Sequence, residues 1–350
     1  MDIQTSLKIL SETVVREKPK FLRDSDSHLF ETELSKELPV SEPTCVSKGF
    51  ILPSGHLMQG RYLVSCQFNM KPGIKGLIKS YATAFLSLIK VRKVSVVSNA
   101  IFVTNSTSTN FFHWFLDVGQ KLEHIDAVFA KNMHERFQIV IPARYANDFA
   151  KSLIAAFDLR VRWLEPDELV VAKNTLAIPE IAPTGNYRKE IVKALSTRLR
   201  KHFSKTKRNG CNRLYISRQG ASKRKLINEA ELIPILRKYG FATVDFDSLN
   251  FDAQISMVYC ADMLVSLHGA GLTHMLWITG GSKIMEIRSR GDALNNCYFT
   301  LASDLGHEYH YILADKIDAK KTVQESDFKV NAQDFEKHLR QMVMPEQYGK

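Results

Sequence analysis

Short apolar runs and longer amphipathic segments follow one another regularly through the second half of the chain. Residues 213–217 read RLYIS, an apolar run with the length of one buried strand. Residues 229–239 form an amphipathic segment that ends at Gly240, and a glycine in this position commonly terminates a helix. The succession predicts an α/β fold, in which helices cover a parallel sheet. We expect strands at 213–217, 241–246, 263–267 and 283–287, and helices at 189–203, 229–239, 251–260 and 272–278.

The first half contains the same two kinds of segment with less regular spacing. Residues 94–103 (VSVVSNAIFV) predict a strand, and a polar stretch rich in helix N-cap residues separates it from an expected helix at 111–122. Pro53-Ser54-Gly55 interrupts two apolar runs and predicts a hairpin within residues 49–68. We also expect strands at 137–142, 161–164 and 169–172, and a helix at 147–157.

The length of 350 residues favours two domains. Residues 1–45 are polar and charged, and they predict an entry segment around one or two short helices. Residues 179–186 contain two prolines and a glycine, which makes them the best candidate for a linker. We therefore expect an N-terminal domain at 1–185, a C-terminal domain at 186–325, and a helix within 326–350 that packs back on the N-terminal domain.

The chain carries a net charge of +11, and the location of this charge is more informative than its size. The segment from Arg188 to Lys225 holds fourteen Lys or Arg and a single acid, Glu190, so the rest of the chain is close to neutral. Such a segment favours an anionic partner, which can be a phosphate group, a nucleic acid or a membrane surface. A solvated basic surface is an equally open interpretation of most of these residues.

Cysteine usage and the N-terminus bear on metal sites and on cellular location. The five cysteines include no C-x-x-C pair and their number is odd, so we expect neither a zinc site nor a disulfide framework. Asp24-Ser25-Asp26 has the D-x-D spacing of a metal-binding motif but lies in the polar entry segment. The N-terminus does not read as a signal peptide, and no apolar run reaches 18 residues. These features predict a cytoplasmic protein.

The stretch SLHGAGLTH, residues 266–274, joins an expected strand to an expected short helix. Glycines there let a ligand approach the backbone, and the first helical N–H groups point at negative charge. The stretch matches neither the Walker A motif nor the G-x-G-x-x-G fingerprint. Two interpretations stay open: a phosphate site, or an ordinary tight turn in which His268 is a packed histidine.

Three charged residues lie at the ends of neighbouring expected strands. Arg218 and Arg224 follow the strand at 213–217, and a guanidinium suits phosphate oxygens, so the pair fits a diphosphate clamp. Glu286 ends the strand after the glycine turn, where a carboxylate can accept both hydroxyls of a ribose. A basic surface loop and an exposed strand-end acid are the respective alternatives.

The stretch NFFHWFLD places His113 and Asp117 four residues apart, on one face of an expected helix that is otherwise aromatic. One interpretation is general-base chemistry on a hydroxyl nucleophile. The other is a buried polar pair whose members satisfy each other.

Taken together and in this order, these segments resemble glycosyltransferase family 61. The matching stretches are NFFHWFLD, LYISRQGASKRKLINEAEL, KYGF, the helix at 254–262, SLHGAGLTHMLW and IMEI. The resemblance covers roughly residues 94–290. Two positions depart from the pattern: His274 stands where similar sequences usually have Asn, and Gly119 stands where a leucine-like residue is usual. The glycine would loosen the packing of its helix.

The resemblance implies the GT-B arrangement, two Rossmann-like domains with parallel sheets facing a central cleft. It implies an inverting transfer of a sugar from a nucleotide-sugar donor, a UDP-sugar, to a hydroxyl of a glycan acceptor, with no metal and no cofactor. Among the members of this family, a bacterial enzyme of capsule, lipopolysaccharide or exopolysaccharide synthesis agrees best with the expected cytoplasmic location. Its acceptor can be lipid-linked. The basic segment then predicts peripheral contact with an anionic membrane at its inner face.

The resemblance also implies roles for individual residues. His113 and Asp117 become candidates for the catalytic base on the acceptor side, and either of them could be the base. The donor nucleotide and its phosphates are assigned to Arg218, Arg224, His268, Gly269, Ala270, Gly271, Leu272, Thr273 and Glu286. Supporting positions are Asn110, Trp114, Ser217, Asn228, Glu229 and Gln254.

Two other functions stay as alternatives. A non-catalytic protein that binds a nucleotide sugar would need the phosphate site but not His113 and Asp117. A nucleic-acid-binding protein would use the basic segment, and it would place aromatic residues among the basic ones for base stacking. Only Tyr187, Phe203 and Tyr215 lie nearby, and no nucleic-acid-binding module is recognisable, so we expect no nucleic-acid partner.

Overall fold

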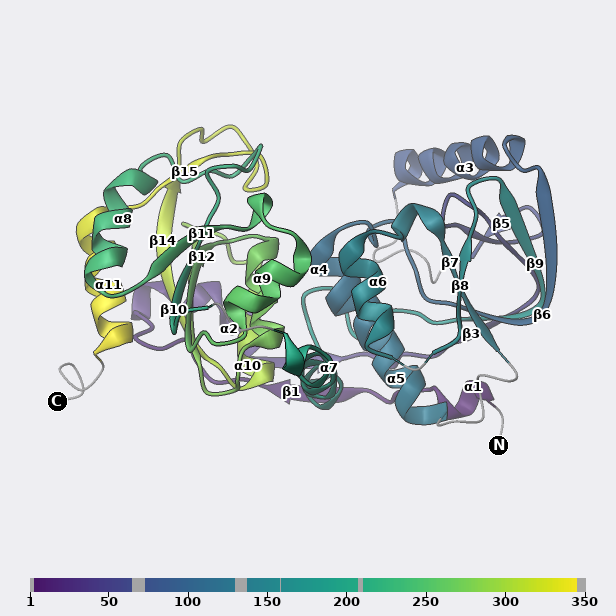
Figure 1. The fold of residues 1–350 in the computed structure, drawn as a ribbon, viewed down its shortest axis with the longest axis horizontal. Helices are drawn as coiled ribbons and strands as arrows, with labels where there is room; N and C mark the ends of the chain where they lie inside the picture. The colour runs from purple at the N-terminus through teal and green to yellow at the C-terminus, as the bar shows by residue number, and fades with distance from the viewer. Residues whose placement is uncertain (1–2, 65–72, 130–136, 158, 207–209, 345–350) are drawn as a thin grey trace. The chain divides into compact units, whose positions relative to one another are not determined.

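The computed structural model describes residues 3–64, 73–129, 137–157, 159–206 and 210–344 (Figure 1). The chain divides into two compact units. The first consists of Met1–Thr13 and Glu37–Leu195, and the second of Val14–Lys36 and Ser196–Lys350. This division differs from the single boundary expected near residue 185, because part of the entry segment belongs to the second unit.

The first unit contains a mixed seven-stranded sheet with the order β5-β4-β3-β9-β6-β7-β8. The strands β9, β6, β7 and β8 run parallel to one another, whereas β3 pairs antiparallel with β9 and forms an antiparallel meander with β4 and β5. The expected hairpin is therefore confirmed. The expected parallel sheet is confirmed only for one part of the sheet, because the other part is antiparallel. The strands are β3 (Thr44–Ile51), β4 (Leu57–Gln59), β5 (Tyr62–Leu63), β6 (Lys93–Phe102), β7 (Gln138–Pro142), β8 (Val161–Leu164) and β9 (Glu168–Ala177).

Helices lie on both faces of this sheet, and one of them, α3, has no counterpart among the expected elements (Figure 1). Gly119 begins α5 at a crowded position, where an added Cβ would lie 3.0 Å from Leu195 Cδ2. The glycine permits close packing here, which corrects the expectation of loose packing. The helices are α1 (Ile3–Ser6), α3 (Ile74–Ile89), α4 (Phe111–His113), a π-helical turn (Trp114–Val118), α5 (Gly119–Phe129) and α6 (Asp148–Ala155); α7 (Lys189–His202) crosses the division between the units.

The segment expected to be a linker belongs to the first unit and is largely buried. Ile181 and Ala182 are 2 % and 6 % exposed. The buried Arg188 donates from Nε to Ile181 O, and from its terminal nitrogens to Leu10 O and Pro39 O. Proline and glycine here shape a packed connection rather than a free one.

The second unit contains a six-stranded sheet with the order β11-β10-β12-β13-β14-β15. Every neighbouring pair is parallel except β14 with the edge strand β15, which confirms the expected α/β alternation. The strands are β10 (Arg213–Ser217), β11 (Ala242–Asp245), β12 (Met263–Leu267), β13 (Lys283–Ser289), β14 (Glu308–Lys316) and β15 (Phe328–Lys329). The helices are α8 (Glu229–Lys238), α9 (Phe251–Val258), α10 (Cys297–Leu305) and α11 (Ala332–Val343), and short 3₁₀ helices span Phe203–Lys205, Phe246–Ser248 and Ala270–Trp277.

The C-terminal helix α11 packs against α8 and β14 of its own unit (Figure 1). Its apolar face, with Phe335, Leu339 and Met342, joins the core beneath the sheet of the second unit. This placement corrects the expectation that the helix packs on the N-terminal domain, because its buried residues are already used here.

Residues 14–36 join the second unit for a similar reason. Phe30 is fully buried, and its ring lies edge-on to Phe299, Tyr309 and Tyr311. Arg16 forms a buried ion pair with Asp304, at 2.9 Å. The segment contains the 3₁₀ helix Asp24–Leu29 and α2 (Glu31–Leu34), and it is flanked by the paired strands β1 (Glu12–Val15) and β2 (Ser35–Leu38).

Among the described residues, no helix combines the length and apolar character that crossing a lipid bilayer requires.

Candidate active-site residues

The sheet of the second unit has a topological switch point between β10 and β12. The chain leaves β10 towards β11 on one side, and leaves β12 towards β13 on the other. In open α/β sheets, ligands bind outside the carboxyl ends of the strands at such a point. The residues that follow these two strands are Arg218 and the His268–Gly271 turn. The structure thus brings together two segments that the sequence nominated separately.

A glycine is needed at position 269 because a larger residue would clash with its neighbours, and not because of its backbone conformation. Its φ of 168° is extended, so any residue could adopt it. A Cβ at this position, however, would lie 2.5 Å from Arg218 Nη1 and 3.2 Å from Arg218 Cζ. The glycine therefore lets the guanidinium lie directly against the turn.

Arg218 and Arg224 are held close together on the loop after β10. Arg218 donates from Nε to Arg224 O, and from Nη2 to Lys223 O, both at 3.2 Å. Arg224 has a φ of +57°, a left-handed conformation that is unusual for a side chain of this size. Burial and the neighbouring Arg224 charge lower the pKa of Arg218. An anion at this position would relieve the repulsion, which makes the loop suited to phosphate oxygens.

His268 is oriented by a buried carboxylate. Glu286 is fully buried; one of its oxygens faces His268 Nδ1, and the other accepts from the Tyr309 hydroxyl. Burial raises the pKa of Tyr309 well above its usual value, so this hydroxyl keeps its proton and donates. Burial alone would raise the pKa of Glu286, but His268, Arg288 and Tyr309 together hold it below its usual value.

This arrangement differs from the expected role of Glu286 as a ribose acceptor. Its carboxylate has no exposed surface, and both oxygens are engaged within the protein. It instead fixes the His268 ring, which keeps 15 % of its side-chain surface exposed and can present Nε2 to a ligand. Tyr309 is a residue that the sequence did not suggest, because β14 carries no motif that would link it to the glycine turn.

The loop that carries the two arginines is anchored at both ends. Glu229 accepts from the hydroxyls of Tyr215 and Ser217, which ties the start of α8 to the end of β10. Asn228 Nδ2 donates to Val330 O at 2.8 Å, which ties the other end to the segment after β15. Asn228, Glu229 and Ser217 are therefore placed to position the loop rather than to contact a ligand.

Several residues after the glycine turn point into the protein. Leu272 and Thr273 are fully buried, so their side chains lie beneath the turn, which corrects their assignment as phosphate contacts. The buried His274 faces two acceptors, with Nδ1 3.0 Å from Gly271 O and Nε2 3.0 Å from Gln254 Oε1, and its neutral ring can donate to one of them. Burial lowers the pKa of His274 to about 4. His274 and Gln254 therefore link the turn to α9.

The first unit has its own switch point, between β6 and β9. The connection from β6 leads to β7 on one side, whereas β9 lies on the other side of β6. His113 lies in α4, the first helix after β6. Asn110 caps this helix, because its side chain accepts a hydrogen bond from Phe112 N. The His–Asp pair thus lies where the topology favours a ligand, and only the strand order reveals this.

His113 and Asp117 form a hydrogen-bonded pair, with 2.7 Å between Nδ1 and Oδ2. The His113 side chain is 23 % exposed and that of Asp117 only 4 %. Asp117 lies in the π-helical turn Trp114–Val118, a local widening that is frequent at functional sites. Burial is the main cause that raises the pKa of Asp117 to about 6, and the Glu180 carboxylate adds to it, whereas His113 and Lys121 oppose it.

A polar network that the sequence did not suggest lies beside this pair. Lys121 is fully buried and donates to Glu180 Oε1 at 2.9 Å and to Val103 O at 3.2 Å. Asn105 donates to the same Glu180 oxygen at 2.8 Å. The network joins the loops after β6 and β9. Asn105 and Glu180 are 75 residues apart in the sequence, so no local pattern could have linked them. Trp114 is fully buried and stacks against Tyr145, as part of the support for the helix.

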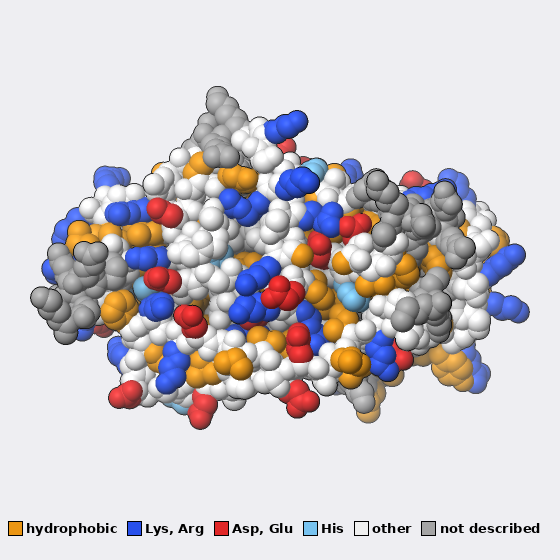
Figure 2. Space-filling view, turned by 90° about the horizontal axis from the view of Figure 1, so that it is seen from below, with side chains coloured by type: hydrophobic (Ala, Val, Ile, Leu, Met, Phe, Trp, Pro, Cys, Tyr) orange, Lys and Arg blue, Asp and Glu red, His pale blue; other side chains and the backbone are white. Residues whose placement is uncertain are grey.

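Several arginines of the basic segment bond within the fold. Arg188 is buried, and Arg200 and Arg213 donate to the backbone carbonyls of Trp277 and Tyr239. On the face drawn in Figure 2, Lys and Arg side chains lie among Asp and Glu side chains. These three arginines are therefore not free to form one continuous binding surface with the rest of the segment. Among the described residues, no group of three or more His, Cys, Asp or Glu is placed to hold a metal ion.

Comparison with known proteins places these residues in context. A family model described as Glycosyltransferase 61 matches residues 111–285, half of the chain. The EGF domain-specific O-linked N-acetylglucosamine transferase of Drosophila melanogaster is 36% identical over 98 residues, which cover 27% of this chain and 18% of that protein. The same-named protein of Bos taurus is 30% identical over 110 residues, covering 30% and 20%. The one of Xenopus laevis is 33% identical over 91 residues, covering 25% and 17%. The chain thus spans about a fifth of the length of these relatives.

Proposed function

Because the chain belongs to glycosyltransferase family 61 and is a glycosyltransferase, we propose that it transfers a sugar from a nucleoside-diphosphate donor to an acceptor hydroxyl, with inversion. The observation that carries this proposal is the approach of Arg218 to Gly269 at the switch point of the second unit. Two arginines and a glycine turn there can hold the phosphates of the donor. As the sugar–phosphate bond breaks, the same groups stabilise the leaving diphosphate.

The proposed base is the His113–Asp117 pair. The acceptor oxygen attacks the anomeric carbon as the bond from that carbon to the phosphate oxygen breaks. The acceptor proton passes to His113 Nε2, because Nδ1 is engaged by Asp117. The carboxylate orients the ring and stabilises the imidazolium that forms. A single displacement of this kind inverts the anomeric centre and needs no covalent intermediate on the protein.

The donor and the acceptor are narrower proposals. The relatives are N-acetylglucosamine transferases, which makes UDP-N-acetylglucosamine the first donor to test. A glycan hydroxyl remains our proposed acceptor, since the shared segment is a fifth of those relatives and carries over no EGF-domain specificity. A place in bacterial surface-glycan synthesis in the cytoplasm stays a prediction of the sequence.

A thermal-shift panel of nucleotide sugars and free nucleoside diphosphates tests the proposal. A ligand at 100 times its dissociation constant adds about 2.7 kcal/mol to the free energy of unfolding, so a true donor stands out. We expect uridine nucleotides to raise the melting temperature and Arg218→Ala to abolish the shift. Equal, absent or Arg218-independent shifts across the panel would contradict a donor site at this turn.

We expect the rate of transfer to fall below about pH 6. Burial raises the pKa of Asp117 to about 6, so above this pH the ionised carboxylate accepts the Nδ1 proton of His113. Below it, Asp117 takes up a proton and the pair loses its basicity. A plot of log kcat/KM against pH should therefore bend at this value. The bend should be lost in the residual activity of Asp117→Asn, and a bend that stays in that variant would assign it to another group.

A further inference from the structure

The helix α3 exposes a row of large apolar side chains that no part of the proposed transfer uses. Ile74, Ile78, Phe85 and Ile89 are 81 %, 63 %, 64 % and 66 % exposed, and they recur at the spacing of one helix face. The buried residue of α3 is Ala84, which packs in one cluster with Leu52 and Met58. A helix with its own apolar face turned to solvent requires an explanation.

The neighbouring strand extends this apolar surface. Val94 and Val96 of β6 are 61 % and 68 % exposed. Val94 is the register partner of Leu169, and Leu169 packs in the same cluster as Ala84 of α3. Register partners point to the same face of a sheet, so these valines lie on the face that α3 covers. Figure 1 shows α3 running along this sheet.

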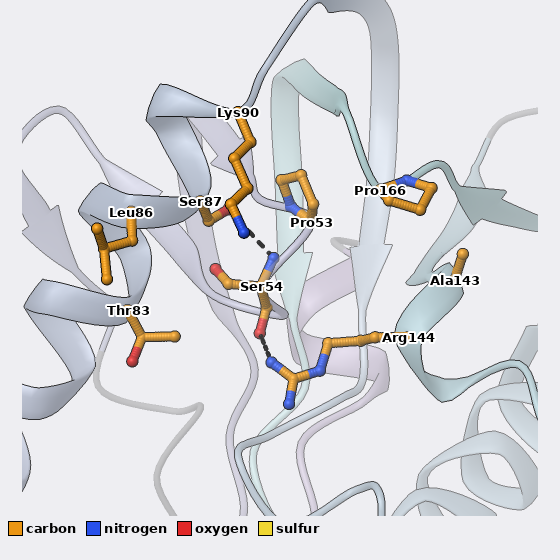
Figure 3. A pocket seen from close by; sticks show the side chains of 9 residues that line it. All are labelled: Pro53, Ser54, Thr83, Leu86, Ser87, Lys90, Ala143, Arg144 and Pro166. Atoms are coloured by element: carbon orange, nitrogen blue, oxygen red, sulfur yellow. Dashed lines mark hydrogen bonds between the residues drawn. The ribbon is translucent and has the colours of Figure 1, made fainter.

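The charge that α3 itself carries has one sign, whereas Asp167 and Glu168 of the neighbouring segment lie beside the start of β6. No Asp or Glu occurs between Glu42 and Asp117, whereas Lys or Arg occurs at eight positions from Lys48 to Lys93. Lys75, Lys79 and Lys90 lie on or beside α3 and are exposed. A cavity of about 500 Å³ borders the helix at Leu86, and Lys90 and Arg144 bring two cations to its wall (Figure 3).

We propose that α3, with Val94 and Val96, is a membrane-docking surface that lies in the interface of an anionic lipid bilayer. The apolar row enters the boundary between headgroups and acyl chains, and the lysines remain at the level of the lipid phosphates. A protein partner would equally bury the apolar row, but α3 carries lysines and no acid, which favours a uniformly anionic surface. The helix lies on the membrane rather than across it, in agreement with the lack of a spanning helix among the described residues.

This surface differs from the basic segment that we first expected to contact lipid. Arg200 and Arg213 of that segment bond within the fold, whereas the α3 surface combines exposed apolar side chains with the exposed Lys75 and Lys79. The contributions of the lysines and of the apolar row to membrane binding can be separated, because salt screens the charge of the lysines but does not weaken the burial of the apolar row.

Co-sedimentation of the full chain with vesicles tests the proposal. The vesicles contain phosphatidylcholine alone or phosphatidylcholine with a third of phosphatidylglycerol. We expect binding to the anionic vesicles and at least tenfold weaker binding to the neutral ones, because each lysine near an anionic surface contributes about fivefold. Ile78→Glu with Phe85→Glu should weaken binding at least tenfold, and Lys75→Glu with Lys79→Glu should weaken it most at low salt.

The matched control replaces exposed apolar residues outside this surface, Leu294 and Ile317, which are 94 % and 52 % exposed. Leu294→Glu with Ile317→Glu adds the same charge and should leave vesicle binding within about twofold. Light scattering measures the oligomeric state of each variant. Absence of vesicle binding, equal loss in the control, or a dimer that only the α3 variant dissociates would overturn the proposal, the last in favour of a second copy of the chain.

Discussion

Replacing Asp117 by Asn should lower turnover by at least about 100-fold, because general-base catalysis contributes 10²- to 10⁴-fold. The substitution keeps the size of a buried side chain and removes the charge that orients His113 at 2.7 Å. An amide can still accept a hydrogen bond, but it cannot stabilise the imidazolium that forms when the acceptor loses its proton. His113→Ala should have an effect of similar size, and the double variant should be little worse than either, since the two residues act as one unit. Steady-state kinetics with a saturating donor measures all three.

Stability separates this role from a structural one. The folded-state pKa of Asp117, about 6, lies above its ordinary value, so its contribution to the free energy of unfolding is present at low pH and is lost as pH rises through about 6. The neutral Asn should therefore not lower the melting temperature at pH 8. The matched control is Asp148→Asn, an exposed carboxylate of the same unit, which should keep turnover within about twofold. Unchanged turnover in both Asp117→Asn and His113→Ala would refute the assignment of the base.

Replacing Arg218 by Ala should lower kcat/KM by about 100- to 1000-fold, the range for removing a group that stabilises developing charge. The guanidinium lies against the glycine turn and beside Arg224, at the position proposed for the diphosphate. Arg218→Lys should recover only a small part, because an ammonium cannot make the two parallel hydrogen bonds of a guanidinium. Nucleoside-diphosphate affinity, measured by calorimetry, should fall in the same order.

Gly269→Ala tests the geometry without removing any charge. Its Cβ would lie 2.5 Å from Arg218 Nη1, so the guanidinium must move, and we expect at least a tenfold loss of donor affinity. Gly280→Ala is the matched control, because its Cβ meets nothing closer than Leu305 O at 3.5 Å. In an Arg218→Ala background, Gly269→Ala should cost nothing further. A full additional loss in that background would mean that the glycine serves another purpose.

The sequence specified much of the second unit. The apolar run at β12 and the helix end at Gly240 appear where local pattern places them, because burial of one face and a left-handed glycine are local requirements. The first unit was harder to predict. Its antiparallel meander depends on the pairing of β3 with β9, whose partner residues lie at least 119 positions apart, as Ile51 and Val170 do. The apolar face of α3 is exposed, so it lacks the usual pattern in which apolar residues are buried.

By itself, the sequence determined the residue types that the chemistry needs: a His–Asp pair on one helix face, paired arginines, and a glycine turn after a strand. It could not determine which side chains face a ligand. Tertiary structure assigned Glu286 to His268 and Tyr309, and it buried Leu272 and Thr273. It also placed each candidate group at the switch point of its own sheet, because strand order is set by long-range pairing that no local pattern encodes.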